Sequence, residues 1–288
     1  MTSLEKIPSC CPQRITSSRA LYAPSIRQAS AAGVSNPYSS RFSASSHSAF
    51  FAERMKRKFG LSEFTDWDQP VVLYGMYKDE DFDALKKIKG GVIVWCGTDA
   101  RVLNASRAAI LKSRPDVRSY AKSKDVYSSL IKWGVRSEIL PVTSTELNIE
   151  VKPRGEWVYC YVCSDNDKMY AKYKMSILKK LAKELKYKFI FTTIKKYKPK
   201  DLMRVYEKCF IGVRLLDHDG LSNSILEMGL MGRRTVSNSG APGTIHWGSF
   251  KKLKNTIINE YRHRKQDNHL IHDEVRKYID IGDKWLEV

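Results

Sequence analysis

The hydrophobic residues of this chain gather in short uninterrupted runs, separated by windows in which an apolar residue recurs every three or four positions. Uninterrupted runs are typical of strands buried on both faces, as in a parallel sheet covered by helices. The intervening windows have the spacing of amphipathic helices. The first half predicts strands at 71–74, 92–96 and 139–141, and helices at 48–59, 80–88 and 124–133.

The same rhythm restarts after a polar segment, residues 143–155, which contains a proline and a glycine and is predicted to be a linker. The second half predicts strands at 157–163, 188–193, 210–216 and 235–237, and helices at 168–186, 200–208, 222–231, 250–264 and 270–286. We therefore predict the α/β fold class, with two Rossmann-like βαβ domains facing a cleft. The domains span 46–150 and 151–265, and 266–288 forms a closing C-terminal helix.

Residues 1–45 differ from the rest of the chain. They are rich in Ser, Ala and Arg, and Glu5 is the only acidic residue. This composition predicts an irregular N-terminal segment, either a disordered arm or a transit-like leader. The alternative is a first strand and loop of the domain that follows.

The overall composition excludes several classes of protein. Hydrophobic residues make up 42% of the 288 residues, which is enough for real cores and excludes wholesale disorder. No stretch approaches the roughly 20 apolar residues of a membrane-spanning helix. Six cysteines are too few for a disulfide scaffold of this size. We expect a cytoplasmic protein from a reducing compartment.

The charge is strongly positive, at +19, and residues 151–200 hold 14 basic and 4 acidic residues. Such a field favours polyanionic partners: nucleic acid, anionic lipid headgroups or phosphorylated ligands. The lysine-rich region 168–200 is therefore a candidate for peripheral association with a membrane or nucleic acid. The alternative is a lysine-rich face that is simply solvated.

The most informative stretch is 212–238. A buried strand ends there in a polar loop with Asp219, and a helix begins near Ser222 and carries Glu227 in its second turn. In open α/β sheets, ligands bind beyond the carboxyl ends of the strands, and a helix N-terminus offers free N–H groups to anions. A loop carboxylate can accept hydrogen bonds from sugar hydroxyls, and a helix carboxylate can accept them from a ribose diol.

This stretch resembles a known family. Residues 219–222 (DGLS) and 226–229 (LEMG) resemble the E-G-F-G-x-x-x-L-E-A-M signature of the GT-B nucleotide-sugar glycosyltransferases, in their retaining, group 1 or family 4-like branch. The short strand 235–237 matches that family's C-G-x-P-V-V segment. The resemblance covers about 157–245, and the first domain only by architecture. It departs at Asp219, where the family usually has Glu.

The resemblance implies roles for particular residues of the second domain. Glu227 would hold the ribose hydroxyls of a UDP- or GDP-sugar donor, and Asp219 would contact the transferred sugar. Backbone N–H groups of Gly220, Leu221 and Ser222 would face the diphosphate.

The family also uses a basic pair against the diphosphate. Lys168 and Lys172 lie in the matching place, although the family motif is not visible there and a solvated helix face is the alternative. Arg214 is a second candidate, because a charge within an apolar strand needs a partner.

The first domain contributes Asp99, which follows strand 92–96 in a Gly-Thr-Asp turn at the carboxyl edge of the sheet. It is a candidate general base or sugar contact, and the alternative is an Asp that caps the next helix. Asp217-His218-Asp219 is formally a D-x-D, a motif that holds a divalent metal in another glycosyltransferase fold. The triplet stands before a glycine turn and a helix, which favours a diphosphate site without a metal.

These observations predict a glycosyltransferase that moves a sugar from a nucleoside-diphosphate sugar to a hydroxyl acceptor, a glycan, a lipid or a modified nucleic acid. The resemblance implies retention, and we expect neither a metal nor a cofactor. The acceptor is a candidate polyanion because of the basic charge. The alternative is a non-catalytic basic α/β module that binds nucleic acid or an anionic membrane.

Overall fold

The computed structural model describes residues 38–42, 46–163, 167–193, 197 and 199–286. Most of the predicted irregular N-terminal segment, residues 1–37, lies outside the described residues. The contacts of residues 36–288 join both sheets described below in one unit.

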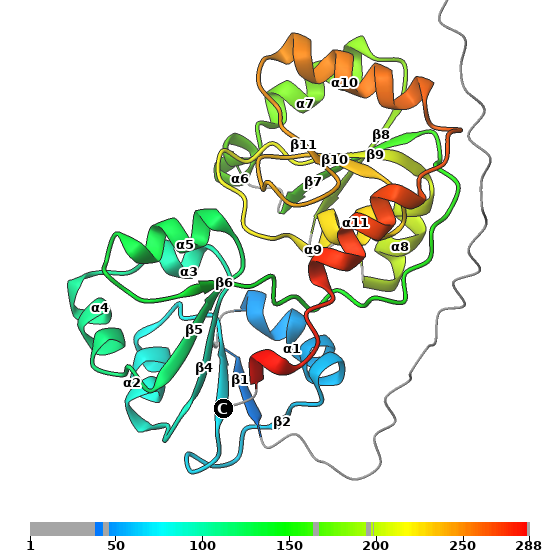
Figure 1. Ribbon diagram of the computed structural model, residues 1–288. Coiled ribbons are helices and arrows are strands. Elements are labelled where there is room, and N and C mark those ends of the chain that lie inside the picture. Colours follow the sequence, from blue (N-terminus) through cyan, green and yellow to red (C-terminus); the bar gives the residue numbers. More distant parts are fainter. Residues whose placement is uncertain (1–37, 43–45, 164–166, 194–196, 198, 287–288) are drawn as a thin grey trace, which may run out of the picture. The chain divides into compact units, whose positions relative to one another are not determined.

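The first half of the chain forms a parallel six-stranded sheet in the order β2-β1-β3-β4-β5-β6 (Figure 1). Its strands are β1 Ser39–Phe42, β2 Ser62–Glu63, β3 Val71–Tyr74, β4 Gly91–Trp95, β5 Val117–Ala121 and β6 Glu138–Ile139. Its helices are α1 Ser46–Phe59, α2 Asp79–Lys87, α3 Thr98–Arg101, α4 Ala105–Lys112 and α5 Lys124–Ile131.

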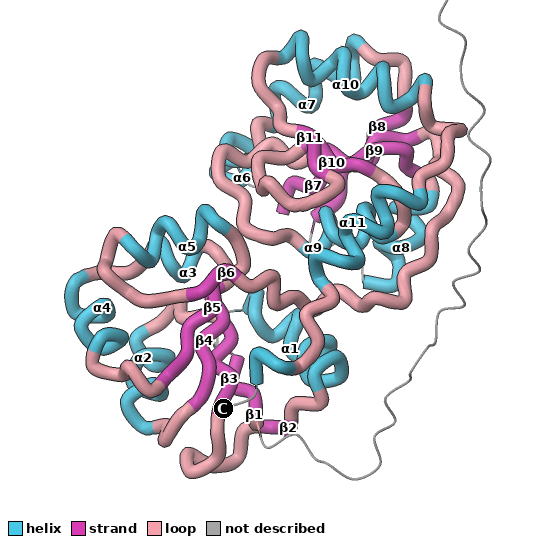
Figure 2. The backbone as a smooth tube through the Cα atoms, viewed as in Figure 1, coloured by secondary structure: helices cyan, strands magenta, loops and turns pink. Residues whose placement is uncertain are grey.

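The second half forms a parallel five-stranded sheet in the order β11-β10-β9-β7-β8 (Figure 2). Its strands are β7 Trp157–Cys163, β8 Lys188–Thr193, β9 Cys209–Val213, β10 Arg234–Val236 and β11 Thr244–Ile245. The helices are α6 Asp167–Lys172, α7 Met175–Glu184, α8 Pro199–Glu207, α9 Asn223–Leu230, α10 Phe250–Arg262 and α11 His269–Ile279, followed by a 3₁₀ turn, η1 Lys284–Leu286.

Both faces of each sheet are buried, which is why the strands are continuous apolar runs. Side chains alternate between the faces of a strand. In the first sheet, Val71 and Leu73 of β3 belong to a different buried cluster from Val72 and Tyr74. In the second sheet, one cluster joins strands to α7 and α10, and another joins them to α8 and α9. The prediction of two doubly covered parallel α/β sheets is confirmed.

The end of the chain returns to the first sheet. Helix α11 packs on α9 of the second half, with Val275 and Ile279 in one cluster with Leu226. Beyond α11, Trp285 lies in the core of the first sheet, with its ring centroid 5.1 Å from Phe59. The described residues of this segment, 266–286, therefore form a helix and a 3₁₀ turn, where the sequence predicted one closing helix.

Two other predictions are corrected. Residues 39–42 are not irregular, because they form β1 and pair with β2 and β3. The helix predicted at 168–186 is broken at Lys174, whose φ of 53° is left-handed. The segment predicted as a linker begins in the interior: residues 143–145 are fully buried, and Lys58 Nζ donates to the carbonyls of Thr143 (3.1 Å) and Thr145 (2.8 Å).

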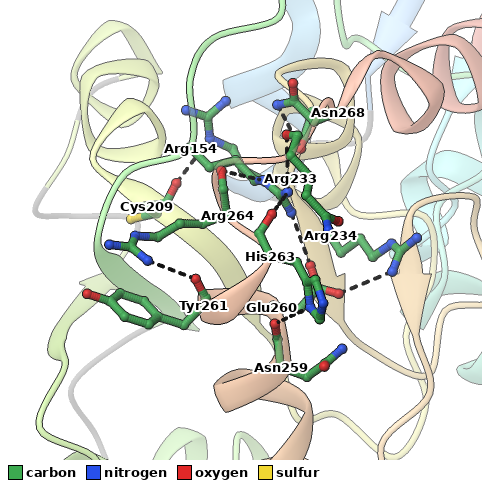
Figure 3. Close-up of polar contacts among 12 residues, drawn as sticks. Arg154, Cys209, Arg233, Arg234, Asn259, Glu260, Tyr261, His263, Arg264 and Asn268 are labelled. Atoms are coloured by element: carbon green, nitrogen blue, oxygen red, sulfur yellow. Dashed lines mark hydrogen bonds and ion pairs between the residues drawn. The ribbon is translucent and has the colours of Figure 1, made fainter.

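Charged side chains form hydrogen bonds and ion pairs in the interior of the second half (Figure 3). The fully buried Arg233 guanidinium donates to six backbone carbonyls, including those of Pro153 (2.7 Å) and Cys209 (3.1 Å). Burial lowers the pKa of Arg233 to about 10. Beside it, the buried Glu260 carboxylate pairs with Arg154 (3.3 Å) and Arg234 (3.1 Å). These contacts join the end of the linker to the sheet.

Within the described part of the chain, every helix is too short or too polar to cross a membrane.

Candidate active site

The carboxyl ends of parallel strands meet at one edge of a sheet, and both sheets carry polar and aromatic side chains there. In the first sheet these are Tyr74 at the end of β3, Cys96 after β4 and Lys122 after β5. In the second sheet they include Thr193 at the end of β8 and Arg214 directly after β9.

Both edges line one pocket of about 510 Å³. Seven tyrosines line it, and the lining side chains that carry charge are mostly basic. The aromatic lining consists of Phe51, Tyr74, Tyr77, Tyr159, Tyr161, Tyr173, Tyr197 and Tyr206, and the ionisable lining of Arg54, Cys96, Arg101, Lys122, Lys172, Arg214, His218, Asp219 and Glu227. The pocket therefore suits an anionic ligand with stackable and hydroxyl-bearing parts.

A second depression, of about 610 Å³, lies along α10 and is lined by Lys251 and Glu260 among others. It is open to solvent, and most of its lining residues belong to α10. The pocket at the strand ends is the better candidate for chemistry.

The loop before α9 forms part of the pocket wall. Gly220, Leu221 and Ser222 all line the pocket, and Ser222 is the extended N-cap residue of α9. The first N–H groups of a helix have no partner within it, so this end of α9 offers donors to an anion. Gly220 approaches the first sheet so closely that a Cβ atom there would lie 3.1 Å from the Cys96 carbonyl oxygen. Only glycine fits without a shift.

Asp219 is held by a buried ion pair. Arg214 Nε donates to Asp219 Oδ2 (2.7 Å), and Ser237 Oγ donates to the same oxygen (3.0 Å). Burial opposes the charge of Arg214, but the Asp219 carboxylate outweighs it and raises the pKa of Arg214. Arg214 also lies over the ring of Tyr161, 4.7 Å from its centroid. Both of these side chains bind Oδ2 of the carboxylate.

Glu227 is held by a residue from the other half of the chain. Arg54 Nη2, on α1, donates to Glu227 Oε1 (2.8 Å), and the two side chains are 18% and 6% exposed. Burial raises the pKa of Glu227 above its ordinary value, and the Arg54 guanidinium opposes the rise. The ion pair thus favours the charged form of a carboxylate at the pocket wall, on the second turn of α9.

Asp99 lies beneath the pocket wall, which corrects the prediction of a general base. Its carboxylate accepts hydrogen bonds from the backbone N–H groups of Met76 (3.3 Å), Cys96 (2.9 Å), Gly97 (2.6 Å) and Ala100 (3.0 Å). The residue is fully buried and does not line the pocket. Burial raises the pKa of Asp99, while these four bonds oppose the rise. The geometry favours the structural alternative, in which Asp99 fixes the turns after β3 and β4.

The two candidate lysines of α6 differ in position. Lys172 is exposed at the pocket rim and lines the pocket, whereas Lys168 is exposed and does not line it. The prediction that the two act as a pair is therefore not supported for Lys168.

The D-x-D aspartates pair with different cations. Asp217 Oδ2 accepts from Lys174 Nζ (2.8 Å), and Asp219 binds Arg214 as above. Within the part of the chain that the structure describes, no group of three or more His, Cys, Asp or Glu residues lies together in a way that suits a metal ion.

Two residues that line the pocket, Arg54 and Lys122, were not predicted from the sequence. Arg54 lies on a surface-type amphipathic helix, 173 positions before its partner Glu227, and no local signal indicates that contact. Lys122 follows β5, whose sequence VRSYA is interrupted by Arg118 and Ser119 and was not predicted as a strand. A basic residue directly after a strand is the only signal that Lys122 offered.

No family model and no curated protein matches this chain. Solved structures match over most of it. TarM has a TM-score of 0.52 at 10% identity, over 75% of this chain and 53% of TarM, so the chain spans about half the length of that protein. The α,α-trehalose 6-phosphate synthase from Burkholderia multivorans has a TM-score of 0.51 at 8% identity, over 83% of this chain and 74% of that one. OtsA in its apo form has a TM-score of 0.53 at 8% identity, over 82% and 75%.

These neighbours are GT-B glycosyltransferases, and at such low identities the likeness concerns the fold. The likeness covers both sheets, whereas the sequence resemblance covered mainly the second. The chain has the two-sheet α/β fold of the GT-B glycosyltransferases, as the resemblance predicted.

Proposed function

We propose that this chain is a glycosyltransferase that moves a sugar from a nucleoside-diphosphate sugar to a hydroxyl acceptor. The observation that carries the proposal is the arrangement at α9. A buried carboxylate, Glu227, and the free N–H end of the same helix face one pocket, which is shared with the carboxyl edge of the other sheet.

The donor nucleotide is proposed to bind along α9. A ribose diol donates hydrogen bonds well to a carboxylate, and the ion pair with Arg54 favours the charged form of Glu227. Its diphosphate would lie at the N-terminus of α9, because the first N–H groups of a helix have no partner within it and Gly220, Leu221 and Ser222 line the pocket there. Asp219 would accept from a hydroxyl of the transferred sugar.

Positive side chains are proposed to replace a metal at the diphosphate. Arg54, Lys172 and Arg214 line the pocket, and Arg214 is already partly neutralised by Asp219. Together with the helix N–H groups, they would stabilise the negative charge that develops on the departing diphosphate. We therefore propose that turnover needs neither a divalent cation nor a cofactor.

The reaction breaks the bond between the sugar anomeric carbon and the diphosphate oxygen and forms one between that carbon and the acceptor oxygen. The acceptor proton passes to the departing diphosphate. No described carboxylate stands free in the pocket as a nucleophile, because Asp219 and Glu227 are paired. This supports front-side attack with retention. Retention is also the subject of work on trehalose-6-phosphate synthase, a structural neighbour at a TM-score of 0.51.

A non-catalytic basic module is the alternative. Such a module needs a basic surface but has no use for two buried carboxylates in a pocket beside a helix N-terminus. The lysine-rich region would then be the binding surface, and the pocket would bind no nucleotide.

The test is release of nucleoside diphosphate from UDP- and GDP-sugars, measured with and without a chelator, together with the shift in melting temperature caused by each nucleoside diphosphate. We expect one nucleotide to raise the melting temperature and its sugar to be consumed. A chain that responds to neither nucleotide contradicts the proposal.

A further inference from the structure

Lys122 is a buried cation in the wall of the pocket. It follows β5 directly, is 4% exposed and lines the pocket. Its Nζ donates to the hydroxyl of Tyr74 and lies 4.4 Å from the centroid of that ring. Among the described residues, no carboxylate lies within ion-pair distance of Lys122.

Such a charge is costly to bury. An ammonium loses its hydration on burial, and a neutral hydroxyl returns only part of that loss. Arg54 and Arg214, the other well-buried cations of this pocket, each have a carboxylate partner at 2.8 and 2.7 Å. Lys122 is the exception among these three.

The nearby acid does not supply the missing partner. Asp99 attracts Lys122 electrostatically, but its oxygens accept from four backbone N–H groups. Burial lowers the pKa of Lys122 below its ordinary value in spite of the attraction from the neighbouring Cys96 and Asp99. A bound anion would stabilise the charged form of Lys122.

The part of the pocket wall that comes from the first half is rich in hydroxyl groups. Tyr74, Tyr77 and Thr98 line the pocket together with Lys122, and Arg101 at the end of α3 lines it as well and pairs with Asp125. The carboxylates that line the pocket, Asp219 and Glu227, both come from the second half of the chain.

We propose that this wall binds an anionic group of the acceptor, a phosphate or a carboxylate, and that Lys122 is its principal contact. The inference rests on the proposed function, because it names the class of acceptor for that site. The proposed donor contacts are α9 with the loop before it, and Arg54, Lys172 and Arg214, so the ends of β3, β4 and β5 are left to receive the acceptor. An acceptor anion beside Lys122 would also hold its hydroxyl group near the sugar.

The experiment uses a matched set of probes: glycerol, glycerol 3-phosphate and glycerate, which differ in the charged group. Their affinities are measured by ligand-observed NMR in the presence of saturating UDP or GDP, so that the diphosphate site is filled. The variants are Lys122→Met, Lys122→Arg and, as a control on the exposed side of α4, Lys112→Met. The nucleotide affinity and the melting temperature of each variant are measured as well.

We expect the wild-type protein to bind at least one anionic probe at least tenfold more tightly than glycerol. Comparison of glycerol 3-phosphate with glycerate then distinguishes a phosphate site from a carboxylate site. Lys122→Met should lose at least tenfold of that affinity, keep its nucleotide affinity within twofold, and melt no lower than wild type. Lys122→Arg should retain the preference for an anion, and Lys112→Met should behave as wild type.

Three outcomes overturn the inference. In the first, the wild-type protein binds neither anionic probe more tightly than glycerol. In the second, Lys122→Met still prefers an anionic probe to glycerol. In the third, Lys122→Met loses nucleotide affinity instead, which assigns Lys122 to the donor. If Lys122→Met does not fold, Lys122 has a structural role, and Lys122→Gln decides by the same readouts. Absence of nucleotide binding by the wild-type protein refutes the proposed function separately, and the probes are then titrated without nucleotide.

Discussion

Removing Arg54 should leave a buried carboxylate without its partner. Losing one member of a fully buried ion pair costs about 3–5 kcal/mol, and we reduce this to about 2–3 kcal/mol because the Arg54 side chain is 18% exposed. For a chain of this size, roughly 2–4 °C of melting temperature corresponds to each kcal/mol, so Arg54→Met should melt about 4–12 °C lower at neutral pH.

The loss should depend on pH. The pKa of Glu227 is raised in the folded protein, so the folded state holds its proton at pH values where the unfolded state has released it. Stability therefore falls as the pH rises from the ordinary value near 4.5 through the raised pKa. Without Arg54 the pKa rises further and the penalty grows. Acidification from pH 7.5 to pH 5 should thus recover part of the stability that Arg54→Met loses.

The assay is denaturant unfolding of wild type, Arg54→Met, Glu227→Gln and the double variant, at both pH values. In the double variant the uncompensated charge is gone, so it should be more stable than Arg54→Met at pH 7.5. An Arg54→Met protein as stable as wild type at pH 7.5, or a double variant no better than the single one, would refute the reasoning.

Four further outcomes are expected. Asp99→Ala should lower the free energy of unfolding by about 3 kcal/mol, because four backbone N–H groups lose their acceptor, and calorimetry should find its nucleotide affinity within twofold of wild type. Weaker nucleotide binding without a loss of stability would instead show that Asp99 acts in the active site. Arg233→Met should cost at least about 3 kcal/mol in urea unfolding, because six backbone carbonyls lose their donor, and a loss below 1 kcal/mol would contradict this. Turnover of the nucleotide sugar should survive EDTA, and complete loss rescued by manganese would assign a metal to the D-x-D. Charge reversal at Lys179, Lys180 and Lys183 should raise the KM of a polyanionic acceptor, more strongly at low salt, and should leave the KM of the donor unchanged. An equal rise of KM for both substrates would refute the assignment of these lysines to the acceptor.

The pattern of apolar runs was sufficient for the fold class. Strands such as β3 and β4 are buried on both faces, so their sequences are continuous and recognisable. Strand β5 was missed because Arg118 and Ser119 interrupt its apolar positions and are only half-buried. The helix predicted over 168–186 has a single apolar stripe, but the left-handed Lys174 divides it, and Lys174 pairs with Asp217. The left-handed conformation of Lys174 cannot be read from periodicity.

The candidate site was predictable only where its residues lie close together in the sequence. The loop and α9 carry Asp219, Gly220 and Glu227 within nine positions, and all three line the pocket. The partners Arg54 and Lys122 come from the other sheet, and their positions depend on how the two halves pack. The geometry of the first sheet also changes the interpretation of Asp99, since its turn could be read as a site or as a cap until its hydrogen bonds were known.

The most direct measurement is a calorimetric titration of the wild-type protein and Glu227→Gln with UDP and with GDP. A lost charge-assisted hydrogen bond to a ribose diol is worth about 1.5–3 kcal/mol, or roughly a tenfold to hundredfold change in Kd. We predict that one nucleotide binds the wild-type protein with one site per chain and binds the folded Glu227→Gln variant at least tenfold more weakly. Equal affinity in the two proteins, or no binding of either nucleotide to the wild-type protein, would contradict the account.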